Sequence, residues 1–487
     1  MTPSRFQTGA CAPGSRARQP APLPAAPLLL AFALLAGCTT VAPDAGMQGV
    51  AQLTQPRIGQ APQLQTDSVP DAGTQARIQA LLQRPLDADT AAALAVLNNR
   101  GLQVRLAAVG LAQVDLARAS RPANPGLHLG RLAGSGTVEI DRGVLVDVLG
   151  LFTLPLARRA AADHLAQAQL QAAADTLALA AAARAAFYQA VAARQLVQYH
   201  AQVQDAADAA TTLAHRMQAA GNFSKLAQMR EQVFQADATA QLMRARHQAL
   251  ATQERLARLL GLGHDAAAFQ LPDRLPDLPP QPADLQQSLQ TGIDQRLDVL
   301  LARQQAASTA RALGLQRSTR FINVLQAGYI NQSSTGARRS NGFELVLELP
   351  LFDFGESRQA RAEAIYLQAV HQAAQVADDA RSELREAHAA HVAAHALARH
   401  HRDELLPLRQ RMADETLLRY NGMLVSVFEL LADARTQIAG VTAAVEALRD
   451  HWLADTQLQL AMTAGAPLGG PSLAPLGTPA AATGASH

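Results

Sequence analysis

The sequence has very little cysteine and few aromatic side chains. Cys11 and Cys38 are the only cysteines among 487 residues, and Phe, Trp and Tyr together make up 4% of the chain. So few cysteines exclude a disulfide-rich scaffold and a metal site built from several thiolates. The scarcity of aromatic rings argues against a thick globular core. Together with abundant alanine, it favours closely packed helices with small side chains between them.

The chain also lacks an excess of charge of either sign. Lys and Arg number 42, Asp and Glu number 40, and the formal net charge is +2. Arg5, Arg16 and Arg18 lie near the N-terminus and no basic stripe follows them, so nucleic acid is not an expected partner. The sequence further lacks a nucleophile–base constellation, a phosphate-binding loop and a credible metal motif, so we expect no enzymatic reaction.

Residues 1–37 are typical of a lipoprotein signal peptide. The apolar segment 24–36 follows the N-terminal arginines and is too short to span a membrane comfortably. It ends in Leu35-Ala36-Gly37-Cys38, which resembles a bacterial lipobox. That resemblance implies cleavage before Cys38 and acylation of its sulfur and its new amino group, for example with palmitate. The alternative is an incidental or buried cysteine.

The residue after the lipobox helps to predict which membrane holds the lipoprotein. Thr39, rather than Asp, follows Cys38, which by analogy with enteric lipoproteins favours the outer membrane. Several acyl chains would anchor the protein durably, because one chain alone binds only marginally. The covalent lipid on Cys38 is the only cofactor that we expect.

The next part of the chain predicts a linker followed by a first repeat. Residues 38–88 are rich in Pro, Gln, Ala and Thr and predict an extended linker, with a short helix near residues 76–83. The first repeat occupies residues 89–262. It comprises a helix to about residue 120 that Asp89-Thr90 could cap, strands at about 127–149, and a helical hairpin at about 157–260 that turns at Gly221-Asn222.

A second repeat, residues 283–464, has the same plan after a Pro-rich crossover at 263–282. It predicts strands at about 321–349 and a helical hairpin at about 356–463 that breaks at Asn421-Gly422. The first arm of that hairpin would span roughly 98 Å at about 1.5 Å per residue, with a kink or loosened hydrogen bonds at Pro407. Residues 465–487 are rich in Gly, Pro, Ala and Ser and predict a disordered tail.

The strands of the second repeat alternate apolar and acidic side chains. We expect Phe343, Leu345, Leu347 and Leu349 to face lipid and Glu344 and Glu348 to face a wet lumen. The alternative is an exposed amphipathic hairpin on a soluble domain. Four strands cannot close a transmembrane barrel, since bacterial barrels begin at about eight. We therefore predict a mainly α protein with a small membrane β part, in which three copies form a 12-stranded β-barrel on a long periplasmic α-barrel.

These repeats resemble the outer-membrane efflux proteins, the TolC-like family. The resemblance covers roughly residues 91–463 and rests on motifs in both halves: Asn98-Asn99-Arg100-Gly101-Leu102, Ala123-Asn124-Pro125, Met217 to Ser224, Gln295-Arg296-Leu297-Asp298, Leu349 to Gly355, and Arg419-Tyr420-Asn421-Gly422. It implies a homotrimer, a periplasmic adaptor and, through the adaptor, an inner-membrane pump that supplies the energy. The lipobox suggests the lipoprotein branch of the family.

The resemblance also implies two kinds of site. The hairpin tips would meet the adaptor through Gly221, Asn222, Ser224, Asn421 and Gly422, and both glycines would supply the positive φ of a tight reversal. Plain helix C-caps are the alternative. Glu429 and Asp433 would form a periplasmic gate, because residues four apart share a helix face and a trimer would gather their carboxylates near one axis. Solvated surface charge is an equal alternative.

A group of histidines lies in the second repeat. His388, His391 and His395 are spaced so that they share one helix face, and imidazoles can bind zinc or copper. No cysteine or well-placed methionine completes such a site. We favour a polar face on an alanine-rich shaft and infer no metal.

The function that we predict is a passive exit duct. The protein would be anchored by lipid in the outer membrane of a Gram-negative bacterium and extend into the periplasm. There it would pass small molecules, drugs or metal ions, delivered by the pump of a tripartite efflux system. One alternative is the duct of a type I protein-secretion system. Another is a lipid-anchored structural coiled-coil protein that conducts nothing.

Overall fold

The structure is a computed structural model of the chain, and it describes residues 44–65, 70–134, 136–263, 269–281, 293–319, 324–348 and 354–465. All of these lie in one compact unit, Val41–His487. The predictions for the signal peptide, for Cys38 and for almost all of the tail therefore concern residues outside the described ranges.

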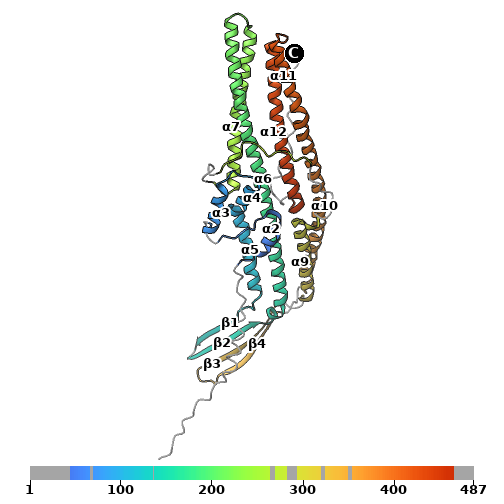
Figure 1. The fold of residues 1–487 in the computed structure, drawn as a ribbon. Coiled ribbons are helices and arrows are strands. Elements are labelled where there is room, and N and C mark those ends of the chain that lie inside the picture. The colour runs from blue at the N-terminus through green and yellow to red at the C-terminus, as the bar shows by residue number, and fades with distance from the viewer. Residues whose placement is uncertain are drawn as a thin grey trace, which may run out of the picture. The chain divides into compact units, whose positions relative to one another are not determined.

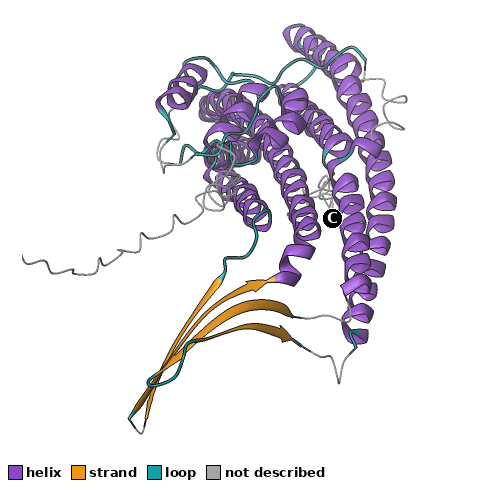
Figure 2. Ribbon diagram, turned by 90° about the horizontal axis from the view of Figure 1, so that it is seen from below, coloured by secondary structure: helices purple, strands orange, loops and turns teal. Residues whose placement is uncertain are grey.

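Four strands form one antiparallel sheet, in the order β1 (Gly126–Gly134), β2 (Thr137–Asp147), β3 (Leu325–Ser334) and β4 (Ser340–Leu347). Figure 2 shows this sheet at one end of the helices. The central pair, β2 with β3, joins the two halves of the chain and places Val144 opposite Tyr329. Among the described residues β1 pairs only with β2 and β4 only with β3, so the sheet has two open edges.

Each strand pair is followed by a long helical hairpin. In the first half, α6 (Val148–Ala219) leads to α7 (Lys225–Leu259). In the second, α10 (Glu356–His400), the π-helical turn η1 (His401–Leu405) and α11 (Leu406–Asn421) lead to α12 (Val427–Thr463). Helix α6 has 72 residues and so extends for roughly 108 Å. The duplicated plan of strand, strand and long hairpin is confirmed (Figure 1).

Helix α6 begins earlier than the sequence predicted. The prediction placed its start at residue 157, after Pro155, but the helix starts at Val148. Asp147 caps it, since its Oδ1 accepts a hydrogen bond of 2.9 Å from the Gly150 N–H. Pro155 lies inside the helix, where its missing N–H removes one backbone bond.

Pro407 loosens the second hairpin, as the sequence predicted. It lies in the first turn of α11, directly after η1. In η1 the Leu406 N–H bonds to the carbonyl of His401, five residues back rather than four. The absent proline N–H and the wider π-helical turn together accommodate the ring without ending the helix.

The N-terminal linker is more structured than predicted. The segment predicted as extended contains helix α2 (Met47–Ile58), and α3 (Ala72–Leu82) lies near the expected short helix. Met47, Val50 and Thr54 are buried on one side of α2, and that helix packs on α6. The apolar pattern of α2 covers only about two turns, which is too short to predict a helix from the sequence. Its contact with α6 supplies stabilisation that so short a helix lacks by itself.

The first predicted helix is in fact two helices. α4 (Ala88–Asn98) and α5 (Arg100–Ala119) replace the single helix expected from residue 89 to 120. Asp87, rather than Asp89-Thr90, caps α4 by accepting from the Thr90 N–H at 2.6 Å. Asn99 breaks the run and caps α5 by accepting from the Leu102 N–H at 3.0 Å.

The core is built largely from alanine on α6. Its central residues are buried against α4, α7, α12 and the crossover between the two halves. Within this core lie Ala183, Ala186, Phe187, Ala190 and Val191. The crossover packs Phe269, Leu271 and Leu275 onto the same cluster. The small side chains allow the close helix packing that the low aromatic content predicted.

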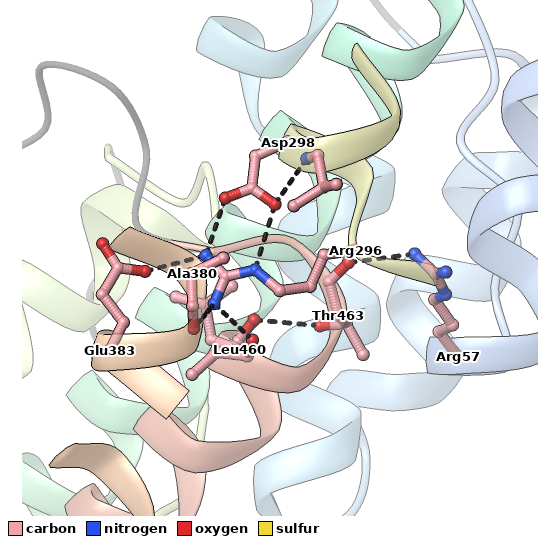
Figure 3. Close-up of polar contacts among 9 residues, drawn as sticks. Arg57, Arg296, Asp298, Ala380, Glu383, Leu460 and Thr463 are labelled. Carbon is pink, nitrogen blue, oxygen red and sulfur yellow. Dashed lines mark hydrogen bonds and ion pairs between the residues drawn. The ribbon is translucent and has the colours of Figure 1, made fainter. Parts of the chain in front are cut away.

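One buried arginine in the second half joins the start of α9, the end of α12 and the middle of α10 (Figure 3). Arg296 lies just before α9 (Leu297–Thr319), and its side chain is 1% exposed. Its Nη1 donates to the carbonyl of Ala461 near the end of α12, at 2.9 Å, and to that of Ala380 in α10, at 3.2 Å. Its Nη2 binds the carboxylates of Asp298 and Glu383 at 2.6 and 2.8 Å. We call these residues the Arg296 junction.

The first half has a neutral counterpart of this junction. Asn98 and Asn99 donate their side-chain amides to the carbonyls of Leu260 and Leu259, at the end of α7, at 3.0 and 2.9 Å. In both halves a glycine with positive φ ends the return helix, Gly261 at 74° and Gly465 at 73°. A Cβ on Gly261 would meet the Asn98 carbonyl oxygen at 2.3 Å, so the close approach requires glycine.

We expect the Arg296→Met substitution to lower the free energy of unfolding by roughly 3–5 kcal/mol, because it leaves two partly buried carboxylates unpaired. Urea unfolding followed by circular dichroism measures this loss. The control is Arg303→Met, whose ion pair with Asp294 is largely exposed and should contribute less than about 1 kcal/mol. Equal losses in the two variants would contradict the role of the junction.

Candidate functional site

The two faces of the sheet carry different side chains. The strand register places one set of alternate residues on what we call the apolar face: Leu127, Leu129, Val144, Val146, Leu325, Ala327, Tyr329, Phe343, Leu345 and Leu347. The opposite face, which we call the carboxylate face, carries Glu139, Asp141, Asp147 and Glu344. It also holds the glycines at 130, 143, 328 and 342, with Leu132, Leu145, Ile330 and Val346 among them.

The apolar face is exposed in the single chain. Phe343 is 92% exposed and Leu345 67%. Phe343 and Tyr329 meet edge to face, with ring centroids 6.0 Å apart. The expected separation of Phe343, Leu345 and Leu347 from Glu344 is therefore present in the register, while Leu349 lies outside the described residues. Such a large exposed apolar area is typical of a surface that meets lipid or another chain.

The first hairpin tip is a helix C-cap followed at once by an N-cap. Gly221 has a φ of 78°, and the Asn222 N–H donates to the Met217 carbonyl at 2.9 Å. Ser224 then caps α7, because its Oγ accepts from the Ala227 N–H at 3.1 Å. The residues predicted at this tip thus form one compact reversal.

The second tip has the same hydrogen bonds but different residues at the key positions. The Leu424 N–H donates to the Arg419 carbonyl at 2.8 Å, and Ser426 caps α12. The prediction that Gly422 takes positive φ was wrong, since its φ is −80°. Met423 takes the left-handed conformation, at 61°. A non-glycine residue is strained there, which is why the sequence pattern suggested the neighbouring glycine.

The proposed gate residues lie on the first turns of α12. Glu429 is exposed and Asp433 is half-buried. Asp433 Oδ2 accepts a short hydrogen bond from the Thr416 hydroxyl of α11. Asp433 therefore ties the two arms of its own hairpin together, and Glu429 has no side-chain bond to the facing arm among the described contacts.

A charged pair that the sequence did not reveal connects the two hairpins. Glu231 of α7 is 3% exposed, and its Oε1 lies 3.0 Å from Nη2 of Arg435 on α12. The Arg435 guanidinium also lies over the Phe234 ring, 4.4 Å from its centroid. Both residues are near the tips, and Arg435 and Phe234 line a groove of about 1080 Å³ between the hairpins. Glu231 and Arg435 are far apart in the sequence, so no local sequence pattern predicts that they pair.

The predicted histidine face is buried rather than polar and exposed. His391 and His395 of α10 are 2% and 3% exposed, and His451 of α12 is 1% exposed. Ring centroids of His391 and His395 lie 5.2 and 5.3 Å from that of His451. Our preference for a polar face was wrong because α12 and the crossover cover it. His395 Nε2 lies 2.9 Å from the Pro279 carbonyl oxygen of that crossover, while His388 is half-buried.

Burial sets the charge state of this cluster. Neither ring nitrogen of His391 or of His451 has a hydrogen-bond partner. Burial, reinforced by His391 and His395, lowers the pKa of His451 to about 4. Burial also lowers the pKa of His391, against the opposing charge of Asp455. In the ranges that the structure describes, no three His, Cys, Asp or Glu side chains are arranged to hold a metal ion.

Similarity to known proteins is found in the fold rather than in the sequence. No protein-family model matches the chain, and no curated protein matches it. Among solved structures, the outer membrane protein VceC from Vibrio cholerae superposes with a TM-score of 0.66 at 17% identity, covering 80% of this chain and 97% of that one. The Campylobacter jejuni CmeC outer membrane channel gives a TM-score of 0.68 at 13% identity, with coverages of 77% and 85%.

A third similar structure is the open state of the Neisseria gonorrhoeae MtrE outer membrane channel, with a TM-score of 0.62 at 15% identity and coverages of 79% and 88%. All three are outer-membrane proteins, and two of them are channels. At these identities the likeness defines the fold. The chain therefore has the TolC-like outer-membrane channel fold, which confirms the predicted fold class.

We expect acid to destabilise the protein through the histidine cluster. The folded-state pKa of His451 lies below the unfolded value of about 6.5, so protons bind the unfolded chain more strongly. The free energy of unfolding then falls as the pH drops from about 6.5 towards 4, by up to about 1.4 kcal/mol per pH unit for one histidine.

Urea unfolding between pH 7.5 and 4.5 tests this. The His451→Phe variant, which keeps a ring of similar size, should lose stability less steeply than the unsubstituted protein. His247, exposed on α7, provides the control, and His247→Phe should leave the pH profile unchanged. Parallel profiles for His451→Phe and the unsubstituted protein would refute the assignment.

Proposed function

We propose that this protein is an outer-membrane exit duct of a tripartite efflux system. The observation that carries the proposal is the two-faced sheet with open edges. In lipid, every unpaired backbone N–H and C=O costs several kcal/mol. A sheet with an apolar face, a carboxylate face and two edge strands that are open on their outer sides is therefore stable in a membrane only when other strands close it into a barrel. Three copies would supply twelve strands, enough for a barrel with a wet interior.

The helices support the same trimer. Apolar side chains, all exposed except the half-buried Ala240, follow α7 at alternating intervals of three and four residues, a spacing typical of a coiled-coil seam: Leu226, Met229, Val233, Ala236, Ala240 and Met243. A second exposed series lies on α10 and α11: Leu397, Leu408, Met412 and Leu418. Nothing in the described part of this chain covers either series. Packing α7 of one copy against α10 and α11 of the next would cover both and build a helical tube.

The hairpin tips are the part that we assign to the adaptor. The second tip presents Met423 and Leu424, 93% and 78% exposed, and the first presents Leu226, 61% exposed. Apolar side chains at the end of a long shaft fit a helical partner with apolar contacts of its own. Gly221, Asn222, Ser224, Asn421 and Gly422 would shape this surface, and the inner-membrane pump would connect through the adaptor.

The lipid on Cys38 and the acidic lumen complete the proposal. Acylation of Cys38 would hold the N-terminus in the outer membrane of a Gram-negative bacterium while the helices extend into the periplasm. The carboxylate face would line the barrel interior, with Glu139, Asp141 and Glu344 facing water. The protein would catalyse no reaction. Substrates such as drugs or metal ions would pass through it passively, driven by the pump.

The first test is conductance. We expect the purified full-length protein to form trimers that dissociate on heating and to conduct ions in planar lipid bilayers with a preference for cations. The Glu139→Gln and Asp141→Asn pair should reduce that preference, because these carboxylates would line the lumen. Folded trimers without conductance would reject the duct and favour a structural coiled-coil protein.

The gate residues give a second test. Glu429→Gln combined with Asp433→Asn should raise conductance, because it removes charge from the tube axis and weakens the bond between Asp433 and Thr416. The matched control neutralises the exposed pair Asp414 and Glu415 on α11 and should leave conductance unchanged. Unaltered conductance and cation selectivity in the Glu429 and Asp433 variant would exclude the gate.

A further inference from the structure

Charged side chains are completely sorted between the two faces of the sheet. Among residues of the four strands, both arginines, Arg131 and Arg142, lie on the apolar face. All four acidic strand residues lie on the carboxylate face. No carboxylate of the described residues forms an ion pair with either arginine. A face that meets only hydrocarbon gains nothing from arginine, so these two cations require a separate explanation.

The arginines lie at one end of that face, beyond an apolar band. The cross-strand row of Val144, Tyr329 and Phe343 closes the band. Arg142 lies in the next row on the same face, about 7 Å further from the helices. Arg131 pairs with Ile140 one row beyond, so the two guanidinium groups are diagonal neighbours within reach of one ligand.

Arg142 is also held in place. Its Nη1 lies 3.4 Å from Asn331 Oδ1, and Asn331 Nδ2 donates to Asn341 Oδ1 at 2.6 Å. This amide row crosses three strands at the level of Arg142. The β3–β4 turn at the same end of the sheet adds the exposed Arg338 and Arg339. We call Arg131 and Arg142, which lie together directly beyond an aromatic pair, the arginine rim.

We propose that the arginine rim binds the phosphate groups of a phosphorylated glycolipid headgroup in the leaflet farthest from the helices. Aromatic rings prefer the boundary between hydrocarbon and headgroups, so Tyr329 and Phe343 would mark that boundary. The rim then lies at headgroup depth, where guanidinium groups bind phosphate through paired hydrogen bonds. The neighbouring Leu127 and Leu129, 70% and 68% exposed, would contact the acyl chains of the same lipid. This inference rests on the proposed barrel.

The test measures binding of three probes to the purified trimer in detergent. The probes are lipid A with two phosphates, the same lipid without phosphates, and inorganic phosphate. Native mass spectrometry or a fluorescence titration supplies the dissociation constants. We expect the phosphorylated lipid to bind at least about tenfold more tightly than the dephosphorylated one, because charge-assisted bidentate contacts are strong. Inorganic phosphate should compete weakly, since it lacks the acyl chains.

Substitution identifies the residues responsible. Arg131→Gln combined with Arg142→Gln should abolish the preference for the phosphorylated lipid, while Arg142→Lys, which keeps the charge, should retain part of it. The control Arg216→Gln with Arg230→Gln removes two exposed arginines from the helices and should change nothing. A preference that survives in the double rim variant, or that is absent from the unsubstituted protein, would overturn the proposal. Equal competition by inorganic phosphate would do the same, since it indicates a free-anion site.

Bilayer conductance of the same preparations separates the two proposals. A protein that conducts but shows no phosphate-dependent lipid binding retains the duct and loses the arginine rim. A folded trimer that neither inserts nor conducts rejects the duct itself, and the rim with it. The double rim variant is used for binding only after its trimer and conductance match those of the unsubstituted protein.

Discussion

The structure depends on how the ends of its long helices are held. Long helices leave carbonyl groups unpaired at their C-termini, and those groups need donors when they are buried. The Arg296 junction provides five hydrogen bonds from one guanidinium to α10, α12 and the start of α9. In the first half, the uncharged side-chain amides of Asn98 and Asn99 donate to the carbonyl groups at the end of α7. The two halves thus hold the end of a return helix with different chemistry, and the charged version is the more sensitive to the loss of a single partner.

The sheet and the helices obtain their stability in different ways. The helices have an alanine-rich core within one chain, together with the buried crossover. Among the residues that the structure describes, the sheet has no such core, since its apolar face is exposed and its two edge strands are open on their outer sides. In the barrel that we propose, the strands would reach their final environment only with other copies and with lipid. Assembly and membrane insertion would then be coupled, because each would remove surface that the other leaves exposed.

Long periodic features were predictable from the sequence, whereas contacts between distant residues were not. The alternation at Phe343, Glu344 and Leu345 and the long apolar helical pattern gave the strands, the hairpins and the duplication. Boundaries were less predictable, since Pro155 lies inside a helix and Met423 takes the conformation expected of Gly422. The burial of His391 against His451, and the contact of Glu231 with Arg435, depend on how α7, α10 and α12 meet. No local sequence pattern predicts these contacts, because each residue, taken alone, looks like an ordinary polar residue on an exposed helix face.

The π-helical turn makes the two hairpins mechanically unequal. Helix α6 is continuous over 72 residues, so the first hairpin is a stiff strut. The second hairpin contains a joint at His401–Leu405, followed by the 16 residues of α11, a lever arm of about 24 Å. A bend of about 10° at that joint would displace the end of α11 by about 4 Å, and it would strain the contact of Arg435 with Glu231 that ties the second hairpin to the first. In the exit duct that we propose, the second hairpin would therefore be the part that bends, and the contact of Glu231 with Arg435 would limit how far its tip moves.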